Sequence, residues 1–323
     1  MGSIVWSDLI NAFRQCKNLN VLATDVPNLS SITNLTGMFD QCTELVGNNN
    51  FNNWDVSNVV NMTNMFHTCS SFNQDIGNWN TSKVTIMTGM FANATSFNRD
   101  IGNWNTSNVN IMAGMFSNAV SFDQPIGLWN TGNVTNMNFM FAGAKAFNQN
   151  INNWNTAVVT TMANMFSVAT NFNQPLNNWN TGNVTQMSRM FSSADAFNQP
   201  LNDWNTGKVL NMRWMFANAG SFNQPLNNWN TGNVTSMDFM FVNAHNFNQP
   251  LNNWNTGKVT TMASMFTGAV SFNQPINSWN TEEVTTLDYM FSGAWSFNQP
   301  LNNWDTKKLP PCEVCLAEAL IKI

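Results

Sequence analysis

The apolar residues of this chain follow a pattern that repeats every 25 residues. In one repeat, Val84, Met87, Met90, Phe91 and Ala94 are separated by 3, 3, 1 and 3 positions. Residues with this spacing lie on one face of a helix. The first half of each repeat therefore predicts a short helical arc with an apolar inner face.

The second half of the repeat has a different spacing. Phe97 and Ile101 are four positions apart with polar residues between them, as on the inner face of an extended segment. In later repeats a Pro precedes the Leu, as in Pro175-Leu176, and Pro cannot donate to a strand ladder. We therefore expect only a short strand or bridge near 176–179, and then a turn at 179–182 that leads into the next helical arc.

The period itself predicts the architecture. Eleven Trp residues follow one another at steps of 25 without an insertion or a deletion: Trp54, Trp79, Trp104, Trp129, Trp154, Trp179, Trp204, Trp229, Trp254, Trp279 and Trp304. A fixed period of this length is typical of a solenoid, in which each repeat forms one coil that buries its apolar face against its neighbours. We expect a repeat solenoid with one short strand and one helical arc per coil, in which the Trp residues form a buried core column.

The two ends depart from the repeat, as terminal coils of solenoids do. We predict a single solenoid domain over 1–323, with an N-terminal cap and degenerate first coil at 1–31 and tandem coils at 32–309. Pro310-Pro311 prevents a further helical arc, so 310–323 is interpreted as a C-terminal cap. A solenoid capped at both ends is not expected to grow end to end, and we expect a monomer.

The motifs also resemble a known family. Ala12-Phe13, Cys16 and Leu19 precede tandem units of the form V-T-x-M-x-x-M-F-x-x-A-x-x-F-N-Q-P-L-N-N-W-N-T. This arrangement is similar to that of the BspA-type leucine-rich-repeat surface proteins, over about residues 4–309. The resemblance implies a leucine-rich-repeat-like solenoid at a cell surface or in a secreted protein. It also implies adhesion to host or matrix components, and it carries over no catalytic residues.

Composition and charge narrow the range of functions. Only 9% of the residues are charged, the formal net charge is −5, and 12 Lys and Arg are spread over 323 residues. So few cations cannot release many counterions, which argues against nucleic-acid binding. The sequence contains no apolar run long enough to insert directly into a membrane, and it starts without the pattern of a signal peptide. The resemblance still favours the cell surface or secretion, with a virion or the cytoplasm as alternatives.

Catalytic and metal-binding chemistry has little support. The two His residues, His67 and His245, lie seven coils apart and are expected to be exposed. Coils stacked roughly 4.8 Å apart would keep them too distant to share a metal or a triad. We therefore expect no enzyme activity, no cofactor and no metal.

The five Cys residues fall into two groups. Cys16, Cys42 and Cys69 occupy a column that holds Ala in later coils, so they are expected to pack as small apolar side chains. The pair Cys312 and Cys315 forms either a disulfide or two free thiols, and a zinc site there would lack a second pair of ligands.

Variation within a strict repeat indicates where a ligand would bind. The position two residues after the first Met of the coil holds Gly or Asn in several repeats, but aromatic residues or Arg in others. The candidate ligand contacts on and beside it are Phe139, Arg189, Arg213, Trp214, Phe239, Tyr289 and Trp295. Exposed aromatic residues with Arg are typical of interaction hot spots. The alternative is that these side chains are tolerated there and partly buried against the neighbouring coil.

Three functions are consistent with these observations. The first is a non-catalytic binding or adhesion protein whose extended surface contacts a protein or glycan ligand. The second is a structural scaffold, or a coat component of a cell envelope or virion. The third, which ranks last, is ice binding through the Thr column (Thr81, Thr106, Thr131, Thr156, Thr181 and Thr206) and the neighbouring Asn column.

Overall fold

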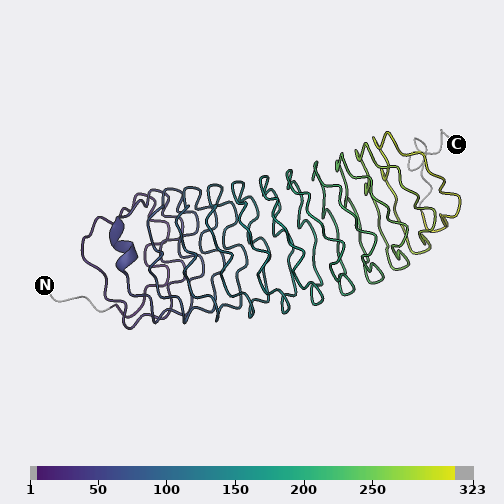
Figure 1. The fold of residues 1–323 in the computed structure, drawn as a ribbon. Helices are drawn as coiled ribbons and strands as arrows, with labels where there is room; N and C mark the ends of the chain where they lie inside the picture. Colours follow the sequence, from purple (N-terminus) through teal and green to yellow (C-terminus); the bar gives the residue numbers. More distant parts are fainter. Residues whose placement is uncertain (1–5, 310–323) are drawn as a thin grey trace. The chain divides into compact units, whose positions relative to one another are not determined.

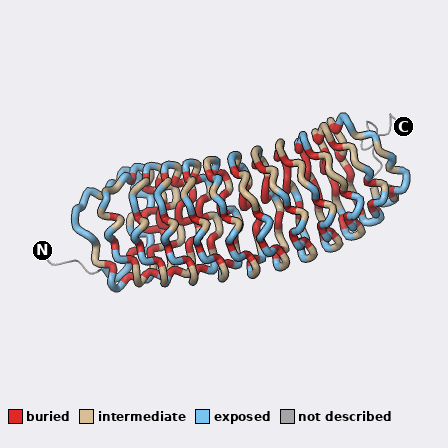
Figure 2. Tube along the Cα trace, viewed as in Figure 1, coloured by how far each residue is buried: buried red, intermediate tan, exposed pale blue. Residues whose placement is uncertain are grey.

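The computed structural model describes residues 6–309 as a succession of similar coils, each 25 residues long over most of the chain. The chain divides into two compact units, Met1–Val159 and Thr160–Ile323. In each unit, buried and exposed residues alternate along every coil, so that the core runs through the inside of the coils (Figures 1 and 2). The repeat solenoid is therefore the architecture of each unit. The predicted C-terminal cap and the pair Cys312 and Cys315 lie outside the described residues.

The predicted helical arc is wrong. The stretch from Met87 to Phe97 forms consecutive turns, in which the N–H groups of Met90, Ala92 and Ala94 donate to the carbonyl three residues before. Every second residue interrupts this pattern and donates instead to the next coil, as Gly89 does to Ala113 at 2.9 Å. Two residues per coil have the positive φ that these turns need, 58° at both Gly89 and Asn93. A helix cannot tolerate that alternation.

The extended part of each coil also lies elsewhere than predicted. Single parallel β-bridges join one residue of each coil to its equivalent in the next, as in Asn61 to Ile86 and Ile86 to Ile111. This residue directly precedes the first Met of the coil. Residues 176–179, where a short strand was predicted, instead form a turn closed by the Trp179 N–H on the Leu176 carbonyl. The turn predicted after Trp179 is present, with Val184 N–H bonded to the Thr181 carbonyl at 2.9 Å.

Aromatic columns fill the core. All eleven Trp residues of the predicted column are buried, with 2% to 8% of their surface exposed. Within unit 1, Trp104 and Trp129 stack at 6.5 Å with an angle of 1° between their rings, and Phe91 stacks on Phe97 at 4.0 Å. The indole N–H of Trp104 donates to the Ile76 carbonyl at 3.0 Å, which satisfies its one polar atom in the core.

The one helix among the described residues is the 3-10 helix η1, Asn49–Asn53. It occupies the stretch in which the sequence carries a two-residue insertion, and it places Phe51 in the core. The Asn48 side chain accepts the N–H of Asn50 and so caps the first turn of η1. The first coil is joined to the second by N–H groups of Asn11, Phe13 and Gln15, at the positions that join later coils.

The Thr column of the ice-binding alternative is buried. Thr306 of the last described coil is exposed, while nine other members are 1% or 2% exposed: Thr81, Thr106, Thr131, Thr156, Thr181, Thr206, Thr231, Thr256 and Thr281. Hydroxyls of these buried Thr residues donate to backbone carbonyls of the next coil, as the Thr81 hydroxyl does to the Asn105 carbonyl at 3.0 Å. The Asn residue before each Thr accepts a backbone N–H two residues on, as Asn130 does from Gly132 at 3.0 Å. Both columns therefore serve the turn and the coil interface, and the Thr residues present no array to water.

We expect Thr231→Val to lower the free energy of unfolding by about 1–2 kcal/mol. Valine has the same shape, but it leaves the Asn255 carbonyl without the hydroxyl that now bonds to it at 2.9 Å. Urea unfolding of the variant measures the change. Thr235→Val is the matched control, because the Thr235 side chain is exposed. An equal loss in both variants would show that the buried bond is not the cause.

Candidate interaction surface

The ligand contacts proposed from the sequence occupy a backbone position with unusual geometry. In every coil this position has φ between 54° and 62°, and we call these twelve residues the left-handed column: Asn11, Gly37, Asn64, Gly89, Gly114, Phe139, Asn164, Arg189, Trp214, Phe239, Ser264 and Tyr289. Gly and Asn adopt this conformation readily, whereas bulky side chains rarely do. Five bulky residues therefore stand where the backbone favours Gly or Asn.

Three of the candidates come together in unit 2. The Trp214 and Phe239 rings stack at 4.1 Å with 11° between their planes. The guanidinium of Arg189 lies over the Trp214 ring, 5.1 Å from its centroid. Trp214 and Phe239 are half-buried, while Arg189 is exposed. Because the three residues belong to consecutive coils, they form one continuous row along the surface, which we call the stacked row.

Beside the stacked row lies a buried carboxylate. Arg213 Nε contacts Asp238 Oδ2 at 3.0 Å, and the Asp238 side chain is only 9% exposed. The Thr261 hydroxyl donates to the other Asp238 oxygen, and the Ser236 hydroxyl lies 3.3 Å from Oδ2. The charge of Arg213 is thus already paired. Arg189, by contrast, has no carboxylate partner among residues 6–309.

The remaining candidates stand apart from the stacked row. Tyr289 is 65% exposed and lies two coils after Phe239, with Ser264 of the intervening coil 8% exposed. Trp295 is 81% exposed and belongs to a neighbouring column of the same coil as Tyr289. Phe139, 48% exposed, belongs to unit 1. The structure therefore assembles Arg189, Trp214 and Phe239, with Arg213 alongside, and leaves the other three as separate exposed side chains.

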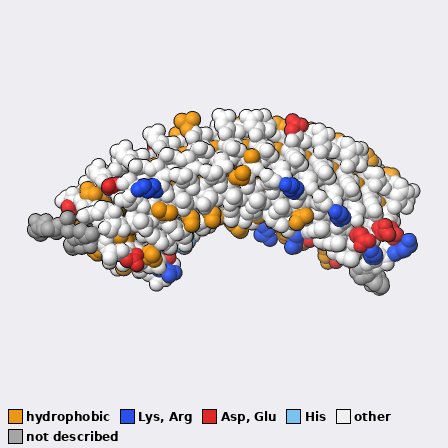
Figure 3. Space-filling view, turned by 90° about the horizontal axis from the view of Figure 1, so that it is seen from below, with side chains coloured by type: hydrophobic (Ala, Val, Ile, Leu, Met, Phe, Trp, Pro, Cys, Tyr) orange, Lys and Arg blue, Asp and Glu red, His pale blue; other side chains and the backbone are white. Residues whose placement is uncertain are grey.

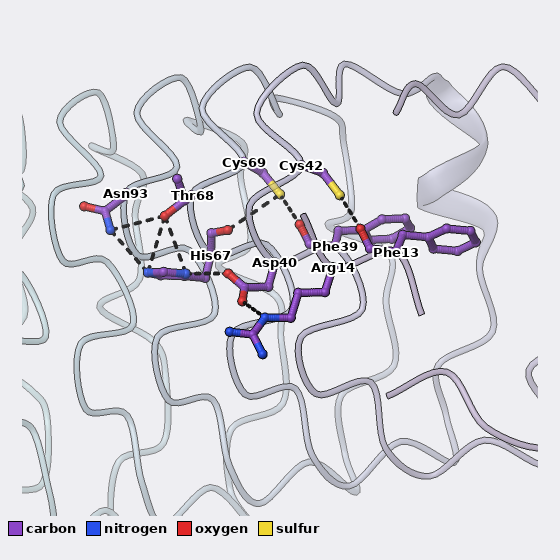
Figure 4. A network of polar contacts seen from close by, with 9 residues as sticks. All are labelled: Phe13, Arg14, Phe39, Asp40, Cys42, His67, Thr68, Cys69 and Asn93. Atoms are coloured by element: carbon purple, nitrogen blue, oxygen red, sulfur yellow. Dashed lines mark hydrogen bonds and ion pairs between the residues drawn. The ribbon is translucent and has the colours of Figure 1, made fainter. Parts of the chain in front are cut away.

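A polar network near the N-terminus was missed in the sequence (Figure 4). Asp40, 8% exposed, accepts Arg14 Nε at 2.9 Å and His67 Nδ1 at 2.6 Å. Arg14, Asp40 and His67 are equivalent positions of three successive coils, so a charged column was readable once the first two coils had been aligned. His67 is therefore a partly buried member of a network, not the exposed side chain we expected, whereas His245 is exposed as predicted.

Two Asn side chains of the following coils contact His67 directly or through one another. Asn93 accepts the amide of Asn118 with its oxygen at 3.0 Å, and so turns its own NH2 group toward His67 Nε2 at 3.3 Å. This orientation makes Nε2 an acceptor and Nδ1 the donor to Asp40. The Thr68 hydroxyl lies 3.4 Å and 3.5 Å from the two ring nitrogens, beside the ring rather than in line with either. That placement does not pair a nucleophile with a base.

Two of the three Cys residues in this column are packed as small apolar side chains. Cys42 and Cys69 are free and buried, and their thiols contact the Phe13 and Phe39 carbonyls at 3.0 Å. Burial raises the pKa of the Cys42 thiol to about 11, and it raises that of Cys69 further. Cys16 is also free, but it is exposed at the edge of the first coil.

Most of the visible surface is neither charged nor hydrophobic. Figure 3 shows a face on which white atoms dominate, with orange, blue and red side chains among them. Among residues 6–309, the side chains of His, Cys, Asp and Glu form no group of three suited to a metal ion. The same residues include no helix of the length and hydropathy needed to cross a bilayer.

One family model matches almost the whole chain. The family is described as "Mycoplasma protein of unknown function, DUF285", and its model matches residues 7–127, 112–229 and 211–320. The chain belongs to this family. The three tandem matches are consistent with the BspA-like repeat and agree with the succession of coils in the structure. No curated protein matches the chain.

Proposed function

We propose that this DUF285 chain is a non-catalytic binding protein of the BspA leucine-rich-repeat type, which contacts a glycan or protein ligand through the stacked row. The observation that carries the proposal is the backbone conformation of that row. An L-residue in the left-handed region costs roughly 1–2 kcal/mol relative to its normal conformation. Arg189, Trp214 and Phe239 all have φ between 57° and 59°.

Folding alone gives no reason to place these residues there. Asn64 and Asn164 occupy the same column at φ 54° and 59°, and Asn tolerates this region well. Mutual stacking of Trp214 and Phe239 contributes about 0.5–1.5 kcal/mol, which at best offsets the conformational cost. Residues held in an unfavourable conformation commonly serve a function, and exposed aromatic residues beside Arg are what binding hot spots contain.

The chemistry of the row favours a particular kind of ligand. The Trp214 ring and the Phe239 ring each cover one face of the other. A ligand would therefore contact the ring edges and the flat guanidinium of Arg189. An unpaired guanidinium presents several N–H donors in one plane to sugar hydroxyls or to a carboxylate. We place the protein at a cell surface or in the secreted fraction, in line with the resemblance, where such ligands occur.

A scaffold or coat component remains the second candidate. It is favoured by the long columns of buried Trp and by side-chain amide bonds between consecutive coils. The Asn243 NH2 group, for example, donates to the Asn218 side-chain oxygen at 2.9 Å, and such bonds hold the coils in register. Tandem coils with few charged residues suit such a role. The two proposals differ in one respect, because only the binding protein requires the stacked row.

Trp214→Asn is expected to weaken ligand binding at least about thirtyfold, because truncation of a hot-spot residue costs 2 kcal/mol or more. The wild-type protein is first screened on an array of glycans and matrix proteins, and the variant is then titrated on each hit. Leu128→Asn is the matched control, since Leu128 is 91% exposed and belongs to unit 1. Hits that both variants bind as the wild type does, or an array without hits, would favour the scaffold.

A further inference from the structure

Two Arg residues lie next to each other at the stacked row. The backbone N–H of Arg189 donates to the Arg213 carbonyl at 2.9 Å, so these residues of consecutive coils are neighbours in space. Both residues are exposed. The Arg189 guanidinium lies 5.1 Å from the centroid of the Trp214 ring, and Arg213 directly precedes Trp214 in the chain. The surface around Trp214 therefore carries two planar groups of hydrogen-bond donors.

The protein itself does not satisfy either guanidinium in full. A guanidinium has five N–H donors in one plane. Those of Arg189 make no hydrogen bond to the residues that the structure describes, because the group lies against an aromatic ring and not against an acceptor. Arg213 contacts Asp238 through Nε at 3.0 Å, but its two terminal nitrogens make no hydrogen bond within residues 6–309. Donors of both side chains thus remain for a ligand, although contacts with the protein already hold them in place.

The other two Arg residues of the chain are used differently. Arg14 Nε donates to the buried carboxylate of Asp40 at 2.9 Å, and Arg99 Nε donates to the Asn73 carbonyl at 2.8 Å. Each of them thus bonds to an acceptor of a neighbouring coil. The Arg189 guanidinium forms no hydrogen bond or ion pair with an oxygen atom of the described residues, and its backbone has φ 57°. Neither an ion pair nor the backbone therefore accounts for an Arg at this position.

The stacked row carries an excess of positive charge. Arg189 and Arg213 contribute two charges, and the buried carboxylate of Asp238 offsets one of them. Asp195 of the same coil lies six residues after Arg189 and forms no ion pair with it. The chain as a whole has a net charge of −5, so this excess is local. A planar guanidinium beside an exposed aromatic surface favours a ligand with an anionic group, because it can bind two oxygens of that group at once.

Uncharged hydrogen-bonding groups lie beside the row. A second column of positive φ, 53° to 56°, follows four residues later in the same three coils, at Ser193, Asn218 and Asn243. The Ser192 N–H donates to the Arg189 carbonyl at 3.1 Å and closes a turn, so the two columns lie close together. Asn218 and Asn243 are exposed, and their amides are bonded to each other at 2.9 Å. A sugar acid matches this composition, because it carries one anionic group among several hydroxyls.

We propose that the stacked row recognises an acidic polysaccharide, whose carboxylate or sulfate group binds the remaining donors of Arg189 and Arg213. The inference rests on the proposed function, because it names the class of ligand for the same row. Trp214 holds the Arg189 guanidinium flat, and Asp238 acts as a positioning residue for Arg213. The amides of the neighbouring column bind the hydroxyls of the sugar.

Calorimetric titration of the full chain with three polysaccharides tests the proposal. Polygalacturonate carries carboxylates, dextran sulfate carries sulfates, and dextran is neutral. We expect the wild type to bind at least one of the charged polymers about tenfold or more tightly than dextran. This affinity should fall as NaCl is raised from about 50 to 300 mM, because salt screens the charge of the ligand. The polymer that binds more tightly identifies the anionic group.

Arg189→Gln is expected to weaken binding of that charged polymer about tenfold or more, because the variant lacks the charge-assisted hydrogen bonds. Lys145→Gln is the matched control, since it removes the same charge from an exposed position of unit 1 and should bind as the wild type does. The double variant Arg213→Gln/Asp238→Asn keeps the net charge and leaves no buried carboxylate unpaired. We expect it to bind about fivefold more weakly than the wild type.

Three outcomes would overturn the acidic polysaccharide as the ligand. The first is that neither charged polymer binds; the proposed function then still stands if a neutral glycan or a protein binds the wild type but not Trp214→Asn. The second is equal weakening by Arg189→Gln and Lys145→Gln, which would indicate unspecific attraction. The third is that poly-glutamate displaces the bound polysaccharide at an equal concentration of charge, which would favour an acidic protein partner.

Discussion

Replacing Trp229 by Ala is expected to lower the free energy of unfolding by about 3–5 kcal/mol. Trp229 is 2% exposed, lies 6.1 Å from Phe216 and 6.3 Å from Trp254, and donates its indole N–H to the Leu201 carbonyl at 2.9 Å. The substitution removes a whole ring from a column and one of the two hydrogen bonds to the Leu201 carbonyl, which keeps only the backbone N–H of Trp204 at 3.1 Å. Urea unfolding followed by far-ultraviolet circular dichroism measures the change.

Trp229→Phe separates the two contributions to this loss. Phenylalanine keeps an aromatic ring in the column but removes the indole N–H, so we expect about half of the loss seen with alanine. A change below about 1 kcal/mol for Trp229→Ala would contradict the burial of the Trp column. Solenoid coils interact only with their neighbours. If the loss of stability in Trp229→Ala is confined to part of the chain, the urea unfolding transition is therefore also expected to broaden.

Alkaline pH is expected to destabilise the N-terminal coils through Cys42 and Cys69. Their pKa values are raised by burial, that of Cys42 from 9.0 to about 11, so both thiols stay neutral in the folded chain at a pH where the unfolded chain ionises. The stabilisation is fully present below pH 9 and is lost as the pH rises toward 11. For Cys42 this amounts to about 2–3 kcal/mol, since each pKa unit corresponds to about 1.4 kcal/mol.

The double variant Cys42→Ala/Cys69→Ala is the matched control for this prediction. Alanine occupies the same column at Ala94 and Ala119, both fully buried, so the replacement fits the coil. Urea unfolding at pH 7.5 and pH 10.5, under reducing conditions, should show a smaller alkaline loss in the variant than in the wild type. An equal loss in both proteins would assign the effect to other groups.

Much of the coil was predictable from the sequence, because the core depends only on which positions are apolar. The Trp column, the Cys42 and Cys69 positions and the turn after Trp179 follow from the 25-residue register. The helix did not follow, since a spacing of 3, 3, 1 and 3 suits consecutive three-residue turns as well as a helix. The informative signal was the recurrence of Gly and Asn at positions 89 and 93, which marks positive φ rather than helix.

The candidate site was predictable only in part for the same reason. The sequence identified the variable position and its aromatic residues, but it could not show that Trp214 and Phe239 stack on each other or that Arg213 is paired with Asp238. Those contacts depend on how far each coil is shifted relative to the coil before it, which the repeat pattern does not specify. The register of Cys16, Cys42 and Cys69 also places Arg14, Asp40 and His67 in one column, but the sequence does not show that their side chains bond to one another.

The central claim is that the bulky residues of the left-handed column are retained for a ligand and not for folding. The free energy of unfolding of Trp214→Asn tests it most directly. The stacking on Phe239 and the contact with Arg189 are lost, but the backbone strain is relieved, so the account predicts a change within about 1 kcal/mol in either direction. A loss of 3 kcal/mol or more would contradict it, because Trp214 would then be a core residue like Trp229.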